Sequence, residues 1–253
     1  MCPALDPTAW PYGYLAVRQP ALHSRGMTTT LITGSNKGLG LEAARRLLAE
    51  GHDVWVAARN PEAGTKAAAD LGARFVQLDV TDDASVTAAV ETVGTLDVLI
   101  NNAGITGSRK EAADVTAADL REVYETNVFG PVRVLHAFLP LLLASGNGVV
   151  VNVSSGLGSQ AATHDPDRIE SKVSAPAYCS SKSALVMLTT QYASALPALR
   201  INAVDPGYTA TDLNGHTGTQ TVTEGTDAIV AMATVGRDGP TGTFTDRDGT
   251  VPW

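Results

Sequence analysis

Short runs rich in β-branched residues alternate with longer helical patterns along most of this 253-residue chain, and this alternation constrains the fold more than any other feature. The runs are expected to be strands at 28–32, 53–58, 73–80, 98–102, 148–154, 200–204 and about 242–245. Strands that alternate with helices form βαβ units, in which the strands lie parallel. The sequence therefore predicts a single α/β domain built on a doubly wound parallel sheet.

Capping residues and apolar spacing mark the helices between these strands. An apolar stripe at helical spacing runs through residues 41–48, and Gly51 can end that helix. Further N-caps are expected at Asn60, Thr81 and Thr116, the last in a capping box with Asp119. That helix should continue to about Leu143, although Pro140 can kink it. Two more helices are expected at 177–195 and 224–235.

Composition excludes several kinds of partner. A hydrophobic content of 44% supports a full core, while a net charge of -8 leaves no basic face for nucleic acid. The acidic charge fits a cytoplasmic protein. The apolar stretch 132–144 is too short to span a bilayer, so no membrane partner is expected. The two cysteines and five histidines show no disulfide or metal-ligand spacing. Whether the chain is a monomer or a homo-oligomer stays open.

Residues 1–26 differ from the rest of the chain. They contain four prolines and no amphipathic period, which is typical of an irregular tail. The first expected strand begins directly after Met27, a residue that could itself start a functional chain. We therefore expect residues 27–253 to form the folded domain and residues 1–26 to be dispensable.

A glycine-rich segment, Thr33-Gly34-Ser35-Asn36-Lys37-Gly38-Leu39-Gly40, follows the first expected strand and enters a helix. Its glycines allow a tight turn that brings backbone N–H groups close to a pyrophosphate. An ordinary strand-to-helix turn accounts for many such loops, so the segment alone leaves that alternative open. It is not a Walker A loop, because Leu39 stands where Gly-Lys-Ser/Thr would be required. Its place in the chain predicts the nucleotide site of a Rossmann fold.

The end of the second expected strand indicates which nucleotide binds. NAD enzymes place a carboxylate there to bind the adenosine ribose, whereas this sequence has Ala58 and Arg59. Arg59 can bind a 2′-phosphate through charge-assisted hydrogen bonds, and Lys37 can add a second positive charge. The alternative is that both are solvated surface cations. The sequence favours NADP(H).

Several further segments occur in a fixed order: Leu78-Asp79-Val80, Asn101-Asn102-Ala103-Gly104, then Asn127, Ser155, Tyr178 and Lys182, and finally Pro206-Gly207 with Thr209 and Thr211. Together with the glycine loop, these segments make the chain resemble the short-chain dehydrogenase/reductase family over residues 28–253. Within that family it is most similar to the carbonyl reductases. The resemblance implies that residues 27–253 are an NADP-binding catalytic domain that transfers hydride between the nicotinamide and a small-molecule aldehyde, ketone or alcohol. The implied cofactor contacts are Gly34, Ser35, Asn36, Lys37, Gly38, Leu39, Gly40, Arg59, Asp79, Val80, Asn102, Ala103, Gly104, Tyr178, Lys182, Pro206, Gly207, Thr209 and Thr211.

Tyr178 and Lys182 are four positions apart, so on a helix both side chains project from one face. A nearby ammonium favours the phenolate, so we expect Lys182 to lower the pKa of Tyr178 from its free value of ~10. The resemblance implies that Tyr178 is the acid and base and that Lys182 also holds the ribose. It further implies that Ser155 polarises the carbonyl and that Asn127 supports a proton relay. Only one of Ser154 and Ser155 can face the substrate, since side chains alternate along a strand.

Three other functions are weighed against this one. A non-catalytic NADP(H)-sensing regulator of the same fold would usually have a damaged set of catalytic residues, and none is damaged here. A serine hydrolase would need a Gly-x-Ser-x-Gly motif around Ser155, which is absent, and a histidine base, for which none of the five histidines is suitably placed. A sugar-nucleotide epimerase would need a larger C-terminal domain. An oxidoreductase is therefore the preferred interpretation.

The segment between Ser155 and Tyr178 is longer than the family commonly has. Residues 162–172 are polar and include Pro166, which is typical of a surface loop or short helix. They are either a neutral insertion, which costs little stability, or a wall of the substrate entrance opposite residues 207–223 that also hinders pairing of subunits. The second interpretation predicts that deleting residues 163–171 changes KM among bulky and small carbonyl substrates and leaves NADPH affinity intact.

Overall fold

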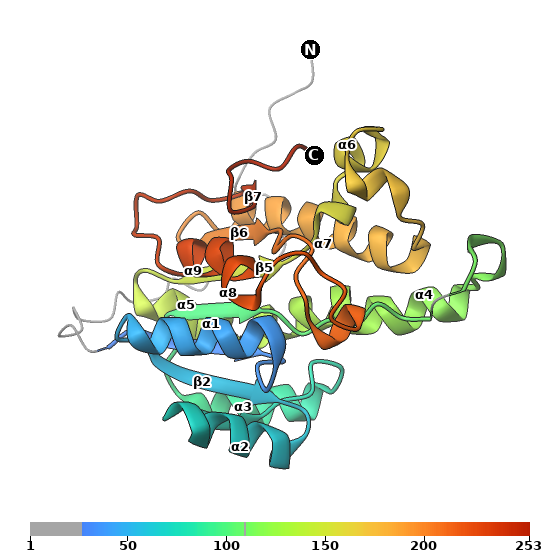
Figure 1. Cartoon of the computed structure of the whole chain (residues 1–253). Coiled ribbons are helices and arrows are strands. Elements are labelled where there is room, and N and C mark those ends of the chain that lie inside the picture. Colours follow the sequence, from blue (N-terminus) through green and yellow to red (C-terminus); the bar gives the residue numbers. More distant parts are fainter. Residues whose placement is uncertain (1–26, 109) are drawn as a thin grey trace, which may run out of the picture.

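Within residues 27–108 and 110–253, which the computed structural model describes, the centre of the molecule is a seven-stranded sheet in the order β3-β2-β1-β4-β5-β6-β7 (Figure 1). The strands are β1 (Thr29–Thr33), β2 (Asp53–Ala58), β3 (Arg74–Gln77), β4 (Val98–Asn101), β5 (Val149–Val153), β6 (Arg200–Val204) and β7 (Phe244–Thr245). Every neighbouring pair is parallel. The predicted doubly wound sheet is confirmed, and its strand order reverses between β1 and β4. The expected tail 1–26 lies outside the described residues.

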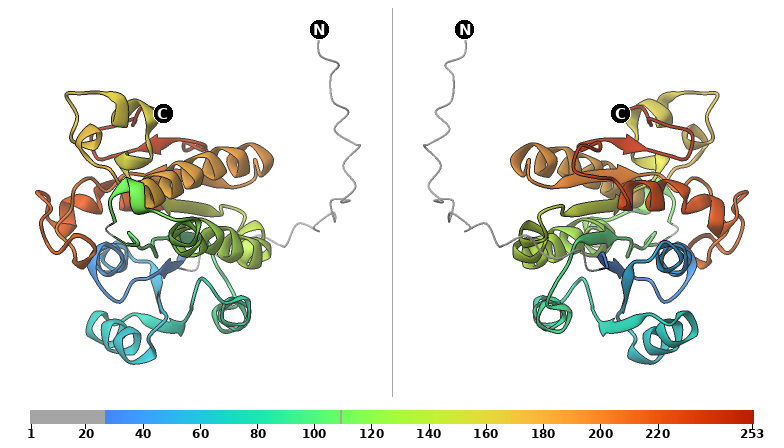
Figure 2. Two further views of the ribbon diagram at one scale, coloured as in Figure 1. Left: turned by 90° about the vertical axis from the view of Figure 1, so that its right-hand side faces the viewer. Right: turned by 90° about the vertical axis from the view of Figure 1, so that its left-hand side faces the viewer.

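Helices cover both faces of this sheet, as the edge-on views show (Figure 2). One layer is α1 (Gly38–Ala49), α2 (Pro61–Leu71) and α9 (Asp227–Ala233), and the other is α3 (Asp83–Val93), α5 (Gly130–Ser145) and α7 (Pro176–Ala195). Successive strand residues point to opposite faces, so Ile32 and Ile100 pack against the first layer while Leu31 and Leu99 pack against the second. Apolar residues on both faces explain why the strand runs are nearly continuous in the sequence.

Shorter elements connect these layers. They are the helices α4 (Ala117–Tyr124), α6 (Gln160–His164) and α8 (Val222–Gly225), the 3-10 turns η1 (Ala112–Asp114), η3 (Gly156–Gly158), η4 (Ile169–Lys172) and η5 (Asp212–Asn214), and the π-helical turn η2 (Glu125–Phe129). The helix predicted from Thr116 is interrupted by η2, and the one predicted at 224–235 is two helices. The chain can change helix type without leaving the helical region, so apolar spacing does not reveal such interruptions.

The predicted helix caps are largely present. The Asn60 side chain accepts from the N–H of Ala63, and Thr116 forms the expected capping box with Asp119. Thr81 was expected to cap α3, which is wrong: Asp82 is the cap, and its carboxylate accepts from two N–H groups of the first turn. An acceptor-only carboxylate at Asp82 serves as well as a hydroxyl, and the Thr81 hydroxyl donates to Asp79 instead.

The continuous helical run Ala117–Ser145 is long and apolar enough to cross a membrane by length and composition alone. In this fold its apolar residues belong to the core: Val134, Phe138 and Leu142 are fully buried in the cluster beneath α5. A core helix of a globular domain has the same composition as a membrane span, so this run is weak support for a membrane partner.

Candidate active site

Loops that leave the carboxyl ends of four neighbouring strands meet at one edge of the sheet. β1 leads into the glycine loop, β4 into Asn102, β5 into Ser155 and β6 into Pro206. In doubly wound sheets, ligands bind in the crevice at this edge, close to the point where the strand order reverses. The topology therefore brings together segments that lie far apart in the sequence.

Two glycines of the loop occupy positions where a side chain would not fit. Gly34 has a φ of +63°, and a Cβ there would lie 2.9 Å from the Cα of Ala103. A Cβ on Gly40 would lie 2.5 Å from Nδ2 of Asn102. The loop backbone consequently packs directly against the segment after β4, which places the start of α1 beside the sheet edge.

The first turn of α1 has the properties of an anion site. Lys37 is the N-cap but its side chain makes no capping hydrogen bond, and the first turn contains no acidic residue. The first N–H groups of a helix have no acceptor within the helix and carry the positive end of its dipole. This end of α1 therefore fits the pyrophosphate of a dinucleotide.

Polar side chains in the predicted cofactor site hold the loop in shape. Ser35 Oγ donates to the Ile32 carbonyl at 2.7 Å and accepts from the β2 backbone at 3.1 Å. Asn102 Nδ2 donates to the carbonyls of Thr33 and Gly34 at 2.9 and 3.1 Å. Because Ser35 is completely buried, its side chain supports the turn, and only its backbone can approach a ligand.

The other predicted cofactor contacts surround the same edge. Asn36 is half-buried before α1, Ala103 and Gly104 are half-buried after β4, Val80 is buried, and Leu39, Pro206, Gly207, Thr209 and Thr211 line the cavity described below. Gly38 has a φ of +57° at the start of α1, a backbone conformation that favours glycine.

Asp79, one of the predicted cofactor contacts, is partly exposed. Its Oδ1 accepts from the backbone and hydroxyl of Thr81 at 3.0 and 2.7 Å. Burial acts to raise the pKa of Asp79, but these hydrogen bonds and the charges of Arg59 and Arg133 lower it below its usual value. The carboxylate is therefore charged at neutral pH and held in one orientation.

Arg59 and Lys37, the two predicted phosphate ligands, differ in their surroundings. The Arg59 side chain is 80% exposed, and its Nε lies 4.0 Å from Oδ2 of Asp79. Lys37 Nζ donates to Oδ2 of Asp212 at 2.9 Å, which joins the glycine loop to the segment after Thr211. Arg59 can meet an incoming phosphate directly, whereas Lys37 would first have to leave Asp212.

Tyr178 and Lys182 lie on successive turns of α7, on the face that the spacing predicts. Lys182 Nζ is 5.6 Å from the centroid of the Tyr178 ring. Lys182 is 4% exposed, and its Nζ donates to the Val153 carbonyl at 2.8 Å, at the end of β5. The amine is thus fixed between the strand end and the tyrosine ring.

Burial dominates the protonation of this pair. It raises the pKa of Tyr178, against a smaller lowering by hydrogen bonding with Ser155, and it lowers the pKa of Lys182 to about 8. In the chain by itself the pKa of Tyr178 is raised, mainly by burial, so the expected lowering by Lys182 is not found there. Tyr178 keeps its proton at neutral pH.

Asn127 connects the segment after β4 with α7. It lies in the π-helical turn η2, accepts from the Ile105 N–H at 2.9 Å and donates to the Ile105 carbonyl at 2.9 Å. Its Nδ2 also donates to Ser181 Oγ at 3.0 Å. A Cβ on Gly104 would lie 3.4 Å from Asn127 Oδ1 and 3.5 Å from Lys182 Nζ, so the absence of a side chain there lets the two groups approach.

The two serines at the end of β5 have separate environments. Ser154 is buried, and its Oγ donates to the Lys182 carbonyl at 3.1 Å. Ser155 is half-buried, accepts from the Leu157 N–H at 3.2 Å and lines a cavity together with Tyr178. Ser155 is therefore the serine that can reach a molecule in that cavity.

This cavity has a volume of about 370 Å³. Its apolar lining comes mainly from Leu39, Val115, Leu157, Val173, Pro176, Tyr208 and Leu213. Polar lining residues include Ser155 and Tyr178 and also Thr106, Ser108, Lys110, Glu111, Thr209, Thr211 and Asn214. Pockets for small molecules commonly measure roughly 300–1,000 Å³ and combine apolar walls with a few polar groups. The cavity therefore fits a small molecule whose polar atom faces Ser155 and Tyr178.

Residues 162–172 do not form a wall of this cavity. Its lining contains none of these residues and resumes after Leu157 at Val173. Arg168 and Glu170 instead line a smaller polar cavity that also contacts Pro206 and Gly207. The segment folds as α6 and η4 and packs near the C-terminus, where the Ala161 N–H donates to the Trp253 carbonyl at 2.9 Å. The prediction that the insertion itself forms the entrance wall is thus wrong, because the chain turns back before the cavity.

Two kinds of site residue were missed from the sequence. Ser181, the partner of Asn127, stands between Tyr178 and Lys182, and a polar residue on the inner face of α7 was the available signal. Tyr208 and Leu213 are each 42% exposed beside the cavity. Exposed apolar residues in a segment with neither helical nor strand period indicate a ligand-facing loop.

The sequence matches the family described as short chain dehydrogenase over residues 28–221. It is 31% identical to (+)-neomenthol dehydrogenase of Capsicum annuum, over 85% of this chain and 94% of that protein. It is 34% identical to NADPH-dependent pterin aldehyde reductase of Arabidopsis thaliana, over 73% of this chain and 76% of that protein. The crystal structure of NADPH-bound carbonyl reductase from chicken fatty liver matches with a TM-score of 0.79 at 30% identity, covering 90% of this chain and 99% of that chain.

Proposed function

The chain belongs to the short-chain dehydrogenase/reductase family, and we propose that it is an NADP(H)-dependent oxidoreductase that interconverts a carbonyl compound and an alcohol. The observation that supports this most is the convergence of Tyr178, Lys182 and Asn127 with Ser155 beside one cavity at the carboxyl ends of the strands. The relatives named above act, by their names, on carbonyl or alcohol groups.

Ser155 and Tyr178 would orient the reacting oxygen. In reduction, negative charge grows on the carbonyl oxygen, and two hydroxyl donors already in place stabilise it. NADPH, when bound along the glycine loop and α1, supplies the hydride. Burial keeps Tyr178 protonated, so its hydroxyl can donate a proton to the new alkoxide.

Lys182 and Asn127 would support that proton transfer. The ammonium of Lys182, held by the Val153 carbonyl, lies close enough to stabilise the phenolate that remains on Tyr178. Asn127 shares the space around Gly104 with Lys182 Nζ, where a water could reconnect the amine to solvent. The assignment of a proton relay to Asn127 rests on this proximity.

A preference for NADP(H) would come from the end of β2. Arg59 is exposed beside Asp79, and Ala58 presents no carboxylate to repel a 2′-phosphate. Each hydrogen bond between Arg59 and that phosphate contributes about 1.5–3 kcal/mol, or roughly tenfold or more in affinity. The names of two relatives above mention NADPH, which agrees with this assignment.

Replacing Ala58 by Asp and Arg59 by Ala should invert the cofactor preference. The change adds a repulsive charge and removes the main phosphate partner, so the ratio of kcat/KM for NADPH over NADH should fall by about 100-fold or more. Arg74→Ala is the matched control. Arg74 is also a surface arginine, but it lies at the start of β3 and pairs with Asp53, at the edge of the sheet away from Arg59. A parent chain that already prefers NADH would contradict the role of Arg59.

The proposed activity is tested with a panel of aldehydes, ketones, quinones and alcohols, followed by NADPH absorbance, with NADH in parallel. Turnover of at least one carbonyl compound with NADPH is the expected result. Tight NADPH binding without turnover of any substrate would favour the NADP(H)-sensing regulator instead. Isothermal titration of NADPH, performed beside the panel, separates these two outcomes.

A further inference from the structure

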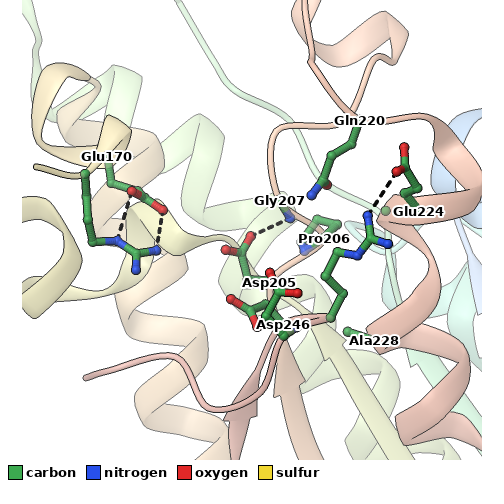
Figure 3. A pocket seen from close by; sticks show the side chains of 12 residues that line it. Glu170, Asp205, Pro206, Gly207, Gln220, Glu224, Ala228 and Asp246 are labelled. Atoms are coloured by element: carbon green, nitrogen blue, oxygen red, sulfur yellow. Dashed lines mark hydrogen bonds and ion pairs between the residues drawn. The ribbon is translucent and has the colours of Figure 1, made fainter.

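Asp205, the residue directly after β6, has no role in the chemistry described so far. It is 6% exposed, and its Oδ1 accepts from the Gly207 N–H at 2.9 Å (Figure 3). Its Oδ2 lies against the backbone of Gly156, where a Cβ would be only 2.7 Å away. A buried carboxylate with a backbone donor on one oxygen and a backbone packed against the other is held in a single orientation.

The two glycines in contact with Asp205 belong to the two loops that border the substrate cavity. Gly156 directly follows Ser155 and begins η3, whereas Gly207 follows Pro206 and lines the cavity itself. These loops leave neighbouring strands, β5 and β6, and Asp205 lies between them. One side chain therefore sets the separation between the loop that carries the serine hydroxyl and the loop that forms the facing wall.

Packing around this carboxylate depends on glycine at both positions. A Cβ on Gly156 would lie 2.7 Å from Oδ2 of Asp205 and 2.6 Å from Oε1 of Glu170. Gly207 has a φ of +68°, which a residue with a side chain rarely adopts. The absence of a side chain at Gly156 and the positive φ of Gly207 thus let both loops approach the same carboxylate.

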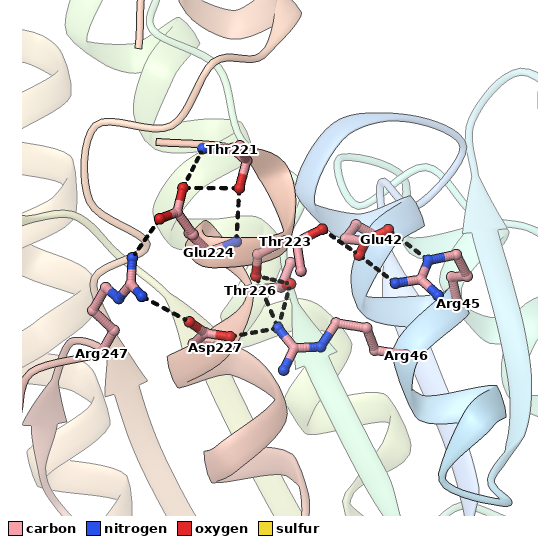
Figure 4. Close-up of polar contacts among 9 residues, drawn as sticks. All are labelled: Glu42, Arg45, Arg46, Thr221, Thr223, Glu224, Thr226, Asp227 and Arg247. Atoms are coloured by element: carbon pink, nitrogen blue, oxygen red, sulfur yellow. Dashed lines mark hydrogen bonds and ion pairs between the residues drawn. The ribbon is translucent and has the colours of Figure 1, made fainter. Parts of the chain in front are cut away.

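The cations near Asp205 already have carboxylate partners. A polar cavity of about 120 Å³ adjoins it, and the charged groups that face it there are Arg168 and Glu170, Glu224 of α8, and Asp246, Arg247 and Asp248 after β7. Arg168 pairs with Glu170 at 2.9 Å, and Arg247 pairs with Glu224 at 3.1 Å (Figures 3 and 4). Over residues 27–108 and 110–253 no Arg or Lys forms an ion pair with Asp205, and no group of acidic side chains could hold a metal ion.

We propose that Asp205 is a positioning residue for the proposed reaction: its carboxylate fixes the Pro206-Gly207 turn against the loop that carries Ser155. This inference rests on the proposed function, since it concerns the same cavity. Asp205 is the only buried aspartate among the described residues, and the proposal gives it a role in the site.

The ionised carboxylate of Asp205 also acts on the catalytic pair, while burial raises the pKa of Asp205 itself. The charge of Asp205 raises the pKa of both Tyr178 and Lys182, and Cys179 is the other titratable group that raises the pKa of Tyr178. A charge that raises the pKa of Tyr178 keeps the proton donor loaded to higher pH. Removing it should therefore move the loss of reductase activity at alkaline pH to lower pH.

Asp205→Asn tests the proposal, because the amide has the same size but lacks the negative charge and has a single acceptor oxygen. We expect kcat for carbonyl reduction to fall by about tenfold or more, and the alkaline limb of the kcat profile to move to lower pH. A merely structural residue would lower the unfolding temperature without moving that limb. Unchanged kcat and an unchanged limb in a folded variant would overturn the proposal.

Asp246→Asn is the matched control. Asp246 lines the same polar cavity, but its Oδ1 accepts from the N–H groups of Asp248 and Gly249, which belong to its own turn. This variant should keep kcat within about twofold and leave the alkaline limb in place. An equal shift of the limb in both variants would show that any nearby charge suffices and would overturn the assignment to Asp205.

Asp205→Glu separates charge from position and carries the test if Asp205→Asn does not fold. The longer side chain keeps the negative charge but moves it relative to Gly156 and Gly207, so the limb should stay while kcat falls. Full kcat in this variant would overturn the positioning role. A parent chain without turnover would instead contradict the proposed function, so the two failures are distinguishable.

Discussion

Replacing Tyr178 by phenylalanine is expected to lower kcat for carbonyl reduction by at least about 100-fold, while NADPH affinity stays within about threefold. The substitution removes one hydroxyl and keeps the ring, which packs beside the Lys182 amine. Ser155 still polarises the carbonyl, so a small residual rate should remain. Steady-state kinetics with NADPH, together with isothermal titration of the cofactor, measure the two quantities separately.

Tyr192→Phe is the matched control for this prediction. Tyr192 lies on the same helix, α7, and packs against the apolar core away from the cavity. Its loss of a hydroxyl should leave kcat near that of the parent chain. If Tyr178→Phe turns over substrate at a near-normal rate while it remains folded, the proposed mechanism is wrong.

Replacing Lys182 by methionine should lower both turnover and NADPH affinity. Turnover should fall by about 100-fold, because the positive charge that stabilises the Tyr178 phenolate is lost. NADPH affinity should fall by about tenfold, since Lys182 is also assigned to the nicotinamide ribose. Lys66→Met is the control, because Lys66 is exposed on α2 and paired with Asp70. A variant that loses turnover but keeps full NADPH affinity would show that the ribose contact is misassigned.

The same variant should be more stable than the parent at neutral pH. Burial lowers the pKa of Lys182 from 10.5 to about 8, so the folded state holds this proton less tightly than the unfolded state. That difference costs about 3 kcal/mol of stability. The cost is complete below about pH 8 and is lost as pH rises to 10.5. Methionine removes it, although the lost hydrogen bond to the Val153 carbonyl offsets a part.

Thermal unfolding at several pH values measures this effect. At pH 7 we expect Lys182→Met to unfold several degrees above the parent, at about 2–4 °C per kcal/mol. The difference should shrink between pH 8 and 10, where the parent recovers stability by losing the proton. A variant that is less stable than the parent at pH 7 would contradict the cost assigned to the buried ammonium.

The features that the sequence predicts well depend on residues close together in the chain. Strand runs, the caps at Asn60 and Thr116, and the one-turn spacing of Tyr178 and Lys182 each involve neighbours within about four positions. The order of these elements also restricts the topology, since parallel strands joined by helices follow few arrangements. For this reason the doubly wound sheet and the segments at its carboxyl edge could be predicted.

The features that only the tertiary structure decided depend on contacts between distant residues. Lys37 pairs with Asp212, and Asp205 joins the loops after β5 and β6, yet no local pattern marks either contact. The insertion at 162–172 turns away from the cavity because it packs near the C-terminal residues, which lie far from it in the sequence. Burial likewise reverses the expected pKa shift of Tyr178, since desolvation depends on every segment that surrounds the ring. The sequence therefore determined which groups reach the site, and the packing of the whole chain determined how those groups are charged and held.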